Sequence, residues 1–552
     1  METRLLRDRK QPGHTKKQAE PGRESRKYLC VFVVLLVYVG ALIYGHDRTP
    51  QALNNDVAEE SLRALYLVEG PHFEVLTFSV GNSAETLYLY LLGIVEHILG
   101  PTTAAIRFTS SCLSLLCIWL VYRLVRRADP SIPYWIPILA GAGSLWLFHY
   151  ASTGLRAISA PVFLCLFAIW LDRTEESSSQ KDAWICGAML GLSIYAYTAT
   201  RVLPVAFVGY ALYRIYRQAD ARALLARRYG VILAGAGLAS IPNLLILLQH
   251  PKEFLSRGSY IYHWGTHADR TIHLIASVIF PFYYPEYYRH SRGPTYDFDA
   301  ISAGLTQPGH NPIHIFLAAA LLIGVWNMKQ FRGRPVIHFL IAVWIVAMLA
   351  LGTAGPSLTR LLLLWPAYIA FAALGLGIVV RQRHWLRVPV LALLIFAGVS
   401  DAYSYLDRAQ RPSLEYSYYF NPAATAIGRG ALTLSTGGKR VLCIVSRDAN
   451  VVRLLAHRGG KLVRVLETAQ PDLEPSDLLL REFAPQFLLV EKNPAFQSLV
   501  SRFPQGLVTD EDPGFYTIRL PARNETACNN RKARSGHRTD LTAVASLSPK
   551  PR

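Results

Sequence analysis

Long apolar runs separated by short basic clusters constrain this chain more than any other feature. A membrane-spanning helix needs roughly 20 predominantly apolar residues, and somewhat shorter runs suffice when flanking side chains reach the interface. Eleven stretches meet this requirement and are the predicted spans. They are 28–45, 106–122, 133–149, 155–171, 184–200, 202–216, 229–249, 312–328, 336–352, 361–380 and 386–400.

The charge of the chain is strongly basic, but its distribution excludes a soluble nucleic-acid-binding protein. There are 57 Lys and Arg against 38 Asp and Glu, a net charge of +19, while 51% of the residues are hydrophobic. A soluble nucleic-acid binder would carry this charge on a polar chain. Here the bases lie in short clusters between apolar runs, so we predict a polytopic α-helical membrane protein with no nucleic-acid partner.

The positions of the basic clusters predict which loops face the cytoplasm, because Lys and Arg are enriched in cytoplasmic loops. The basic tail 1–27 is therefore predicted to be cytoplasmic, and residues 28–45 to be a retained first helix rather than a signal peptide. Eleven spans then put the other basic clusters on the same side and leave two long loops and the C-terminal region outside. The outer segments are 46–105, 250–311 and everything after 400.

Two further apolar stretches, 84–99 and 270–284, are short and interrupted by charged residues, prolines and tyrosines. We expect both to be helices that lie at the membrane interface. Counting 84–99 as a span would reverse the predicted side of each later basic cluster until a second extra span restored it, so the charge pattern favours the interfacial prediction.

Beyond residue 400 the pattern changes to short apolar runs that alternate between strand-like and helix-like. This alternation predicts a small extracytoplasmic α/β domain at 401–520 with a mostly parallel sheet, acting as a lid or interaction domain. The polar, basic segment 521–552 is predicted to be disordered. The expected strands are 439–446, 461–467, 486–492 and 514–520, and the expected helices are 448–459, 476–483 and 494–503.

Carboxylates gather in the first outer loop, and Asp56 is the leading candidate for chemistry. One interpretation makes Asp56 the N-cap of the helix-like run after it, with Glu59 as the acidic partner of a capping box. The other makes it a general base that accepts a proton from an acceptor hydroxyl or amine. The loop's acids are Asp47, Asp56, Glu59, Glu60, Glu69, Glu74, Glu85 and Glu96.

Glu85 opens an apolar stretch, where a charge is costly unless it faces protein or water. It is interpreted either as an acid at a helix start or as part of a polar pocket or metal site. Arginines at outer span ends are disfavoured by the charge rule and so need anionic partners, either internal carboxylates or a lipid phosphate. The four candidates are Arg107, Arg156, Arg201 and Arg360.

The chain resembles the GT-C glycosyltransferases, which include the protein O-mannosyltransferases and the aminoarabinose transferase of lipid A. The first outer loop carries the pattern DxxEE, then ETLYLY, and then GP followed by an arginine. The resemblance covers residues 28–400. Later segments that carry it are ASTGLRAISAPVFL, GLSIYAYTATRVLP, IPNLLILLQHPKEFLSRGS and GPSLTRLLLLWPAYIAFAALGLG.

This resemblance implies an inverting transferase that uses a sugar linked to polyprenyl or dolichyl phosphate. The family's proposed base maps to Asp56, and its arginine after the interfacial helices maps to Arg107, a phosphate contact. The second acid stays open between Glu59 and Glu60. Glu85 precedes Thr86 where the family usually has proline, which weakens its assignment.

Three function classes remain for comparison. A glycosyltransferase in a bacterial inner or plasma membrane, with a glycan, lipid or protein acceptor, is the preferred prediction. A transporter or flippase would instead show charged or broken helices near the midplane and internal repeats. A scaffold would act through 401–520. No cofactor is assigned; a divalent metal is left open, with His263 and His267 only a weak pair of candidate ligands.

Overall fold

The computed structural model divides into two compact units, Met1–Thr425 and Ala426–Arg552, and each is described by itself. The first unit therefore extends beyond residue 400, where the sequence predicts the domain boundary. The structure describes residues 35–43, 52–70, 73–79, 82–177, 179–252, 267–279, 281–282, 313–331, 333–352, 357–409, 421–446, 448–468, 485–501, 503, 505–510, 512 and 515–520.

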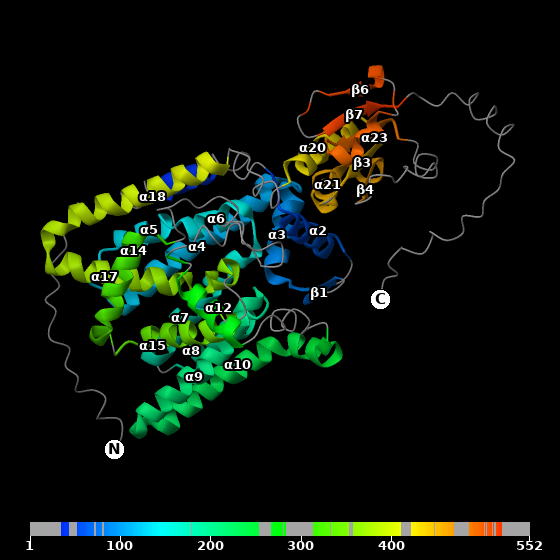
Figure 1. The fold of residues 1–552 in the computed structure, drawn as a ribbon. Helices are drawn as coiled ribbons and strands as arrows, with labels where there is room; N and C mark the ends of the chain where they lie inside the picture. Colours follow the sequence, from blue (N-terminus) through cyan, green and yellow to red (C-terminus); the bar gives the residue numbers. More distant parts are fainter. Residues whose placement is uncertain are drawn as a thin grey trace. The chain divides into compact units, whose positions relative to one another are not determined.

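The first unit is a bundle of helices with one two-stranded hairpin (Figure 1). Residues 35–43 are helical and precede the segment 46–105, the predicted first outer loop. That loop contains α2 (Asn55–Glu69), β1 (Leu76–Ser79), β2 (Asn82–Glu85) and α3 (Leu87–Leu99). The bundle continues with α4 (Thr103–Ala128), α5 (Trp135–Ala142), α6 (Leu145–Thr153), η1 (Arg156–Ile158), α7 (Ser159–Ser177), α8 (Gln180–Ser193), η2 (Thr198–Arg201), α9 (Val202–Arg217), η3 (Ala219–Ala221) and α10 (Arg222–Gln249).

The second half of this unit also consists of α-helices connected by short helical turns. Its elements are α12 (His267–Ile279), α14 (Ile315–Trp326), η4 (Met328–Phe331), α15 (Pro335–Ala347), the π-helical turn η5 (Met348–Gly352), α16 (Leu358–Leu361), η6 (Leu362–Leu364), α17 (Trp365–Gln382), η7 (His384–Leu386) and α18 (Arg387–Ala409).

Five helical segments of the described chain are long and apolar enough to cross a membrane. Several predicted spans differ in detail from the observed helices. The run 133–149 is broken at Gly143 into α5 and α6, and 184–200 ends in a turn before η2. The last helix, α18, continues past 400 to Ala409. Membrane helices therefore confirm the predicted fold class, while the count of eleven stays a prediction.

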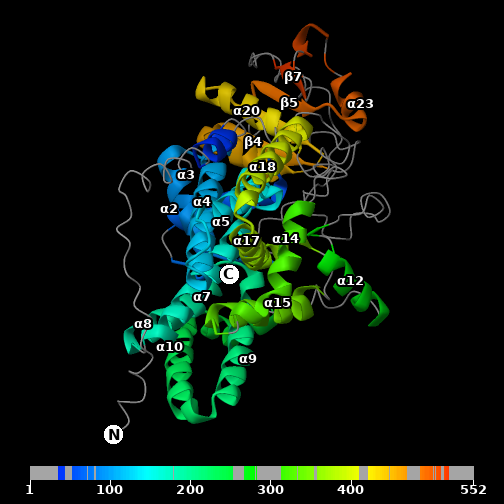
Figure 2. The ribbon, with the colours of Figure 1, turned by 90° about the vertical axis from the view of Figure 1, so that its left-hand side faces the viewer.

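Burial separates a central helix from peripheral ones. The apolar window of the segment Leu358–Gln382, which includes α17, is 94% buried inside the protein, against 28% for Ala219–Gln249 and 22% for His384–Asp407. Helices α10 and α18 thus present most of their apolar surface outward, as lipid-facing helices do. Figures 1 and 2 show α17 among its neighbours and α9 and α10 as an antiparallel pair.

Glycines let two pairs of helices approach to backbone contact. A Cβ on Gly375 of α17 would lie under 3.0 Å from the carbonyl oxygen of Ala320 on α14, and one on Gly324 would meet Phe371 of α17 equally closely. Gly187 and Gly191 play the same role between α8 and α10. Small residues at helix interfaces are the usual means of tight packing in membranes, where lipid supplies no hydrophobic drive for association.

The first outer loop contains the helix predicted after Asp56, and it also contains a hairpin that the sequence pattern did not indicate. Strands β1 and β2 pair antiparallel, with Leu76 opposite Glu85. In α3 the apolar residues on one face are exposed, which agrees with an interfacial position; the interfacial placement itself stays a prediction. The exposed side chains are Leu87, Leu91, Ile94 and Ile98.

The second unit contains a five-stranded sheet in the order β4-β3-β5-β7-β6, comprising β3 (Val441–Val445), β4 (Val463–Glu467), β5 (Phe487–Glu491), β6 (Val508–Thr509) and β7 (Phe515–Arg519). The first three strands are parallel, and β7 and β6 add antiparallel pairs. Its helical elements are α20 (Pro422–Thr436), which begins just before the unit boundary, α21 (Ala449–Leu455), η8 (His457–Leu462), η9 (Pro494–Phe496), α23 (Gln497–Val500) and η10 (Gln505–Leu507).

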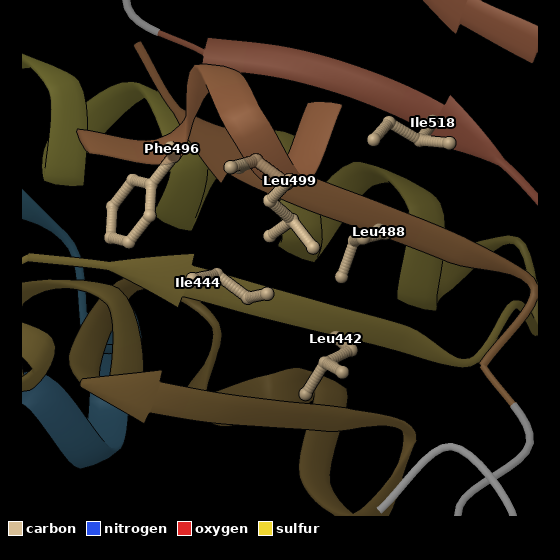
Figure 3. Close-up of a cluster of buried hydrophobic side chains, with 7 residues drawn as sticks. Leu442, Ile444, Leu488, Phe496, Leu499 and Ile518 are labelled. Atoms are coloured by element: carbon tan, nitrogen blue, oxygen red, sulfur yellow. The ribbon is translucent and has the colours of Figure 1, made fainter. Parts of the chain in front are cut away.

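The core of the second unit is an apolar layer on one face of this sheet. Figure 3 shows Leu442 and Ile444 of β3, Leu488 of β5 and Ile518 of β7 together with Phe496 and Leu499. The predicted α/β character and the four expected strands are confirmed, but the sheet is mixed rather than mostly parallel, because β7 and β6 pair antiparallel. The predicted helix 476–483, the tails 1–27 and 521–552 and most of the loop 250–311 lie outside the described residues.

The α14–α17 contact predicts the effect of adding one methyl group. Gly375→Ala should lower the apparent melting temperature in detergent, because its Cβ meets rigid backbone; overpacking of this kind costs on the order of 1–3 kcal/mol. Gly237→Ala on α10 is the matched control, since nothing lies within 4 Å of its Cβ. It should leave the melting temperature unchanged or raise it. Equal melting curves for the two variants would contradict the contact.

Candidate functional site

Glu85 is the centre of a buried cluster of charges at the end of β2. Its side chain is 1% exposed, and its Oε1 lies 3.1 Å from Nη2 of Arg201. The same oxygen accepts a hydrogen bond of 2.7 Å from the Thr198 hydroxyl, while Oε2 lies 3.8 Å from Nη1 of Arg156. A carboxylate removed from water needs such partners, because an isolated buried charge is very costly.

Arg156 joins Glu85 to a second carboxylate, Glu60. The Arg156 Nε lies 2.9 Å from Oε1 of Glu60, and the Arg156 backbone N–H donates to Oε2 of Glu60 at 3.3 Å. The guanidinium also lies over the ring of Tyr197, with 5.8 Å to the ring centroid, in a cation–π contact. We call Glu60, Glu85, Arg156 and Arg201 the charge cluster.

The cluster is assembled from four segments that are distant in sequence: α2, β2, η1 and η2. Gly154 directs the chain from α6 into η1. Its φ of +89° is in the left-handed region, and a Cβ there would overlap the side chain of Ile106. Glycine tolerates this conformation without the clash that other residues meet. The Tyr88 hydroxyl donates to the Gly154 carbonyl at 2.7 Å, which ties α3 to the same turn.

Asp56 lies in the first turn of α2 and is exposed. The prediction that Asp56 is the N-cap is wrong. The N-cap of α2 is Asn54, whose Oδ1 accepts a hydrogen bond of 2.7 Å from the Asp56 backbone N–H. Asp56 is therefore not used to begin the helix. Its charge interacts electrostatically with Arg156, as do the charges of Glu60 and Glu85.

The structure distinguishes the two acids that the sequence left open. Glu59 forms an ion pair with Arg63 one turn along the same helix, with the Glu59 side chain 35% exposed. Glu60, the next residue, belongs to the charge cluster. For Glu85, the interpretation as a helix-start acid also fails, because it ends β2 and helix α3 begins at Leu87.

The other two predicted arginines lie on neighbouring segments. Arg107 is in the first turns of α4 and is buried, at 1% exposure. Arg360 is half-buried in α16, whose N-cap Ser357 accepts from the Arg360 backbone N–H at 3.4 Å. Helix α16 contacts η2, which ends in Arg201, and its Thr359 hydroxyl lies 2.7 Å from the Tyr150 hydroxyl of α6.

Three contributors were not predicted from sequence: Thr198, Tyr197 and Tyr88. The segment YTATR contained a signal for the first two, since a 3-10 turn brings Thr198 next to Arg201. Tyr88 had no comparable signal, because its role depends on the distant turn at Gly154.

Metal binding finds no support in the described part of the chain. No group of three or more His, Cys, Asp or Glu side chains among the described residues is arranged to hold a metal ion. Glu60 and Glu85 face guanidinium groups, which oppose a cation at that position. His263 and the side chain of His267 lie outside the described residues.

The sequence matches no protein-family model and no curated protein. The structure is similar to ArnT from Cupriavidus metallidurans, both bound to undecaprenyl phosphate and in the apo state. Each comparison gives a TM-score of 0.55 at 12% identity, covering 88% of this chain and 97% of ArnT.

Two more distant likenesses are an oligosaccharyltransferase of Archaeoglobus fulgidus, in complex with Zn and sulfate, and the Pmt1-Pmt2 protein O-mannosyltransferase complex of S. cerevisiae bound to the sugar donor. The first has a TM-score of 0.43 at 13% identity, covering 82% of this chain and 68% of that one. The second has a TM-score of 0.33 at 14% identity, covering 42% and 34%. The fold assignment rests on ArnT and confirms the GT-C fold expected from the sequence.

Removal of the Glu85 charge should destabilise the protein. Glu85→Gln leaves two arginines with one carboxylate fewer, and breaking a buried pair costs on the order of 3–5 kcal/mol. Because the Arg201 side chain is 24% exposed, we expect the lower end of this range. Thermal unfolding in detergent measures the change.

The matched control is Glu59→Gln, which breaks a more exposed pair worth about 0–1 kcal/mol. The double variant Glu85→Gln/Arg201→Gln should recover part of the lost stability, because it removes the unpaired positive charge. Equal losses for Glu85→Gln and Glu59→Gln would show that the cluster does not stabilise the fold.

Proposed function

We propose that this protein is a membrane glycosyltransferase that moves a sugar from a polyprenyl- or dolichyl-phosphate carrier to an acceptor at the extracytoplasmic face, with inversion. Three findings support the proposal. The chain has the GT-C fold, and ArnT, whose structure it resembles over 88% of its length, binds undecaprenyl phosphate. The predicted acid and arginine segments also converge.

The observation that carries the proposal is the charge cluster itself. Four segments separated in sequence bring Glu60, Glu85, Arg156 and Arg201 together, and Asp56 lies near enough for its charge to act on Arg156. Carboxylates and guanidinium groups in one place supply the two functions that sugar transfer from a phosphate needs. These are a proton acceptor and a stabiliser of the leaving phosphate.

In the proposed reaction the acceptor oxygen or nitrogen attacks the anomeric carbon from the face opposite the carrier phosphate. The new glycosidic bond forms as the bond from the anomeric carbon to the phosphate oxygen breaks. The acceptor proton goes to the Asp56 carboxylate, and the bonding electrons leave with the polyprenyl phosphate. A nearby guanidinium stabilises the negative charge that develops on that phosphate.

The four arginines divide by exposure. The Arg156 side chain is 4% exposed and interacts with both Glu60 and Glu85, which suits a residue that holds the site together. The Arg201 side chain is 24% exposed, so it is our first candidate for the donor phosphate. Arg360, on the adjoining α16, is the second. Arg107 is the remaining candidate, and it is buried at 1% exposure.

Asp56→Asn should reduce sugar transfer by about 10²- to 10⁴-fold, because it removes the proton acceptor. The fold should be retained, since Asp56 is exposed and Asn54 caps the helix. The assay follows labelled sugar from a panel of undecaprenyl-phosphate sugars into envelope lipid and glycan fractions. Glu69→Gln, an exposed acid on the last turn of α2, is the control.

Full transfer by Asp56→Asn would refute the base assignment while leaving the enzyme class intact. Absence of transfer by the wild type from every donor, with movement of the lipid-linked sugar across vesicle membranes, would instead favour a flippase. Activity of residues 401–520 in partner binding, with Asp56 dispensable, would favour a scaffold.

Arg201→Gln should lower kcat by about 10²- to 10³-fold, because it removes a charged donor from the leaving phosphate. It should also weaken the binding of undecaprenyl phosphate in a titration. Arg217→Gln is the matched control: this exposed arginine is the last residue of α9, the helix that begins directly after Arg201. Equal effects of the two substitutions would remove Arg201 from the phosphate site.

A further inference from the structure

Glu96 is a buried acid of the first outer loop that the proposed reaction does not use. It lies on α3 with 0% exposure. Its Oε1 accepts a hydrogen bond from the hydroxyl of Ser61 on α2, itself 0% exposed. Its Oε2 is buried without a hydrogen-bond partner among the described residues, and no arginine or lysine of the described chain forms an ion pair with it.

Burial raises the pKa of Glu96 from 4.5 to about 8, and the hydrogen bond from Ser61 opposes the shift only in part. Glu96 is therefore mainly protonated at neutral pH. Charged or titratable side chains on the packed elements include Glu60 and Arg63, which are paired with Arg156 and Glu59 respectively. Other charged or titratable side chains on these elements are Tyr88 and His97 on α3 and Arg107 on α4.

The partner of Glu96 is next to the charge cluster in sequence and in space. Ser61 directly follows Glu60 on α2, the helix whose first turn carries Asp56. Helices α2 and α3 are in close contact, since a Cβ on Gly93 would overlap the carbonyl of Ala64. Asp56 and Glu60 both lie on α2. A shift of α2 against α3 would therefore change the positions of both acids at once.

Tyr88 connects the same helix to the other side of the cluster. Its hydroxyl donates to Gly154, two residues before Arg156. Burial, with the charges of Glu60 and Glu96, raises the pKa of Tyr88. Helix α3 thus contacts both α2, through Glu96 and Ser61, and the turn that presents Arg156, through Tyr88.

We propose that Glu96 is a positioning residue: in its neutral form it holds α2 through Ser61, and so fixes Asp56 and Glu60 relative to Arg156. Loss of the proton leaves a carboxylate at a buried site with the Ser61 hydroxyl as its donor, which loosens α2 from α3. The catalytic consequence rests on the proposed function; the structural consequence does not.

The direction of the pH effect follows from linkage. The folded protein binds the Glu96 proton more tightly than the opened one, so the contribution to stability is complete below about pH 4.5. It is lost as the pH rises toward 8, by up to about tenfold in the opening equilibrium for each pH unit. Above about pH 8 it no longer changes.

Hydrogen exchange of the full-length protein in detergent tests the structural consequence. At each of pH 6, 7 and 8, the exchange rate of peptides from α2 is compared between wild type and Glu96→Gln, so that intrinsic rates cancel. The ratio of wild type to variant should rise with pH, by up to about tenfold for each unit. Glu69→Gln should behave as the wild type at all three values.

A ratio that stays constant with pH would overturn the proposal. If Glu96→Gln perturbs the fold by itself, faster exchange of α2 at pH 6 will show it. Ser61→Ala then provides the second test: it should increase exchange in α2 at pH 6, where Glu96 is protonated. Unchanged exchange in Ser61→Ala would also count against the contact.

The activity measurement separates this proposal from the proposed function. The rate of sugar transfer by the wild type should fall above about pH 8. Glu96→Gln should have the wild-type kcat at neutral pH and should not show this decrease at alkaline pH. If transfer occurs but both pH profiles agree, the positioning role fails and the enzyme class stands. If no donor supports transfer, the exchange experiment still decides whether Glu96 controls α2.

Discussion

The arrangement of the site depends on the burial of the Glu85 carboxylate. A charge at 1% exposure is stable only with counter-charges close by, and they come from η1 and η2, the single turns that begin α7 and α9. Because Glu85 belongs to the first outer loop, these ion pairs fasten the loop to the helix bundle. Glu60 adds a second attachment through the same arginine.

The site combines residues that are buried and held by several contacts with residues that are accessible from outside the protein. Arg156 is enclosed by two carboxylates and an aromatic ring, so its position is set from several directions. Asp56 is exposed and Arg201 is partly so. In the proposed transferase, a rigid buried layer thus supports an accessible one, which is how preorganised electrostatic sites avoid reorganisation during reaction.

Hydropathy and charge predicted the membrane class, and strand–helix alternation predicted the α/β unit, because both depend on local patterns. Strand direction does not appear in such a pattern, so the antiparallel pairing of β7 was not predicted. The hairpin β1–β2 was missed since strands of four residues leave almost no periodic signal. The break between α5 and α6 was likewise hidden inside one apolar run.

For the charge cluster, sequence reasoning named its four charged residues but not how they pair. The arginines at predicted span ends were expected to need anions, and for Arg156 and Arg201 the structure supplies internal ones, Glu60 and Glu85. The choice between Glu59 and Glu60 was open because consecutive helical residues point about 100° apart. Only the packing of α2 determines which of the two faces Arg156.

Gly154 gives the site an unusual kind of vulnerability. It carries no charge and takes no part in the proposed chemistry, yet its positive φ and the nearby Ile106 side chain leave no room for another residue. A comprehensive mutational scan would therefore find it among the least tolerant positions of the chain. A substitution at Gly154 would thus disturb the turn that presents Arg156 without altering any charge of the site.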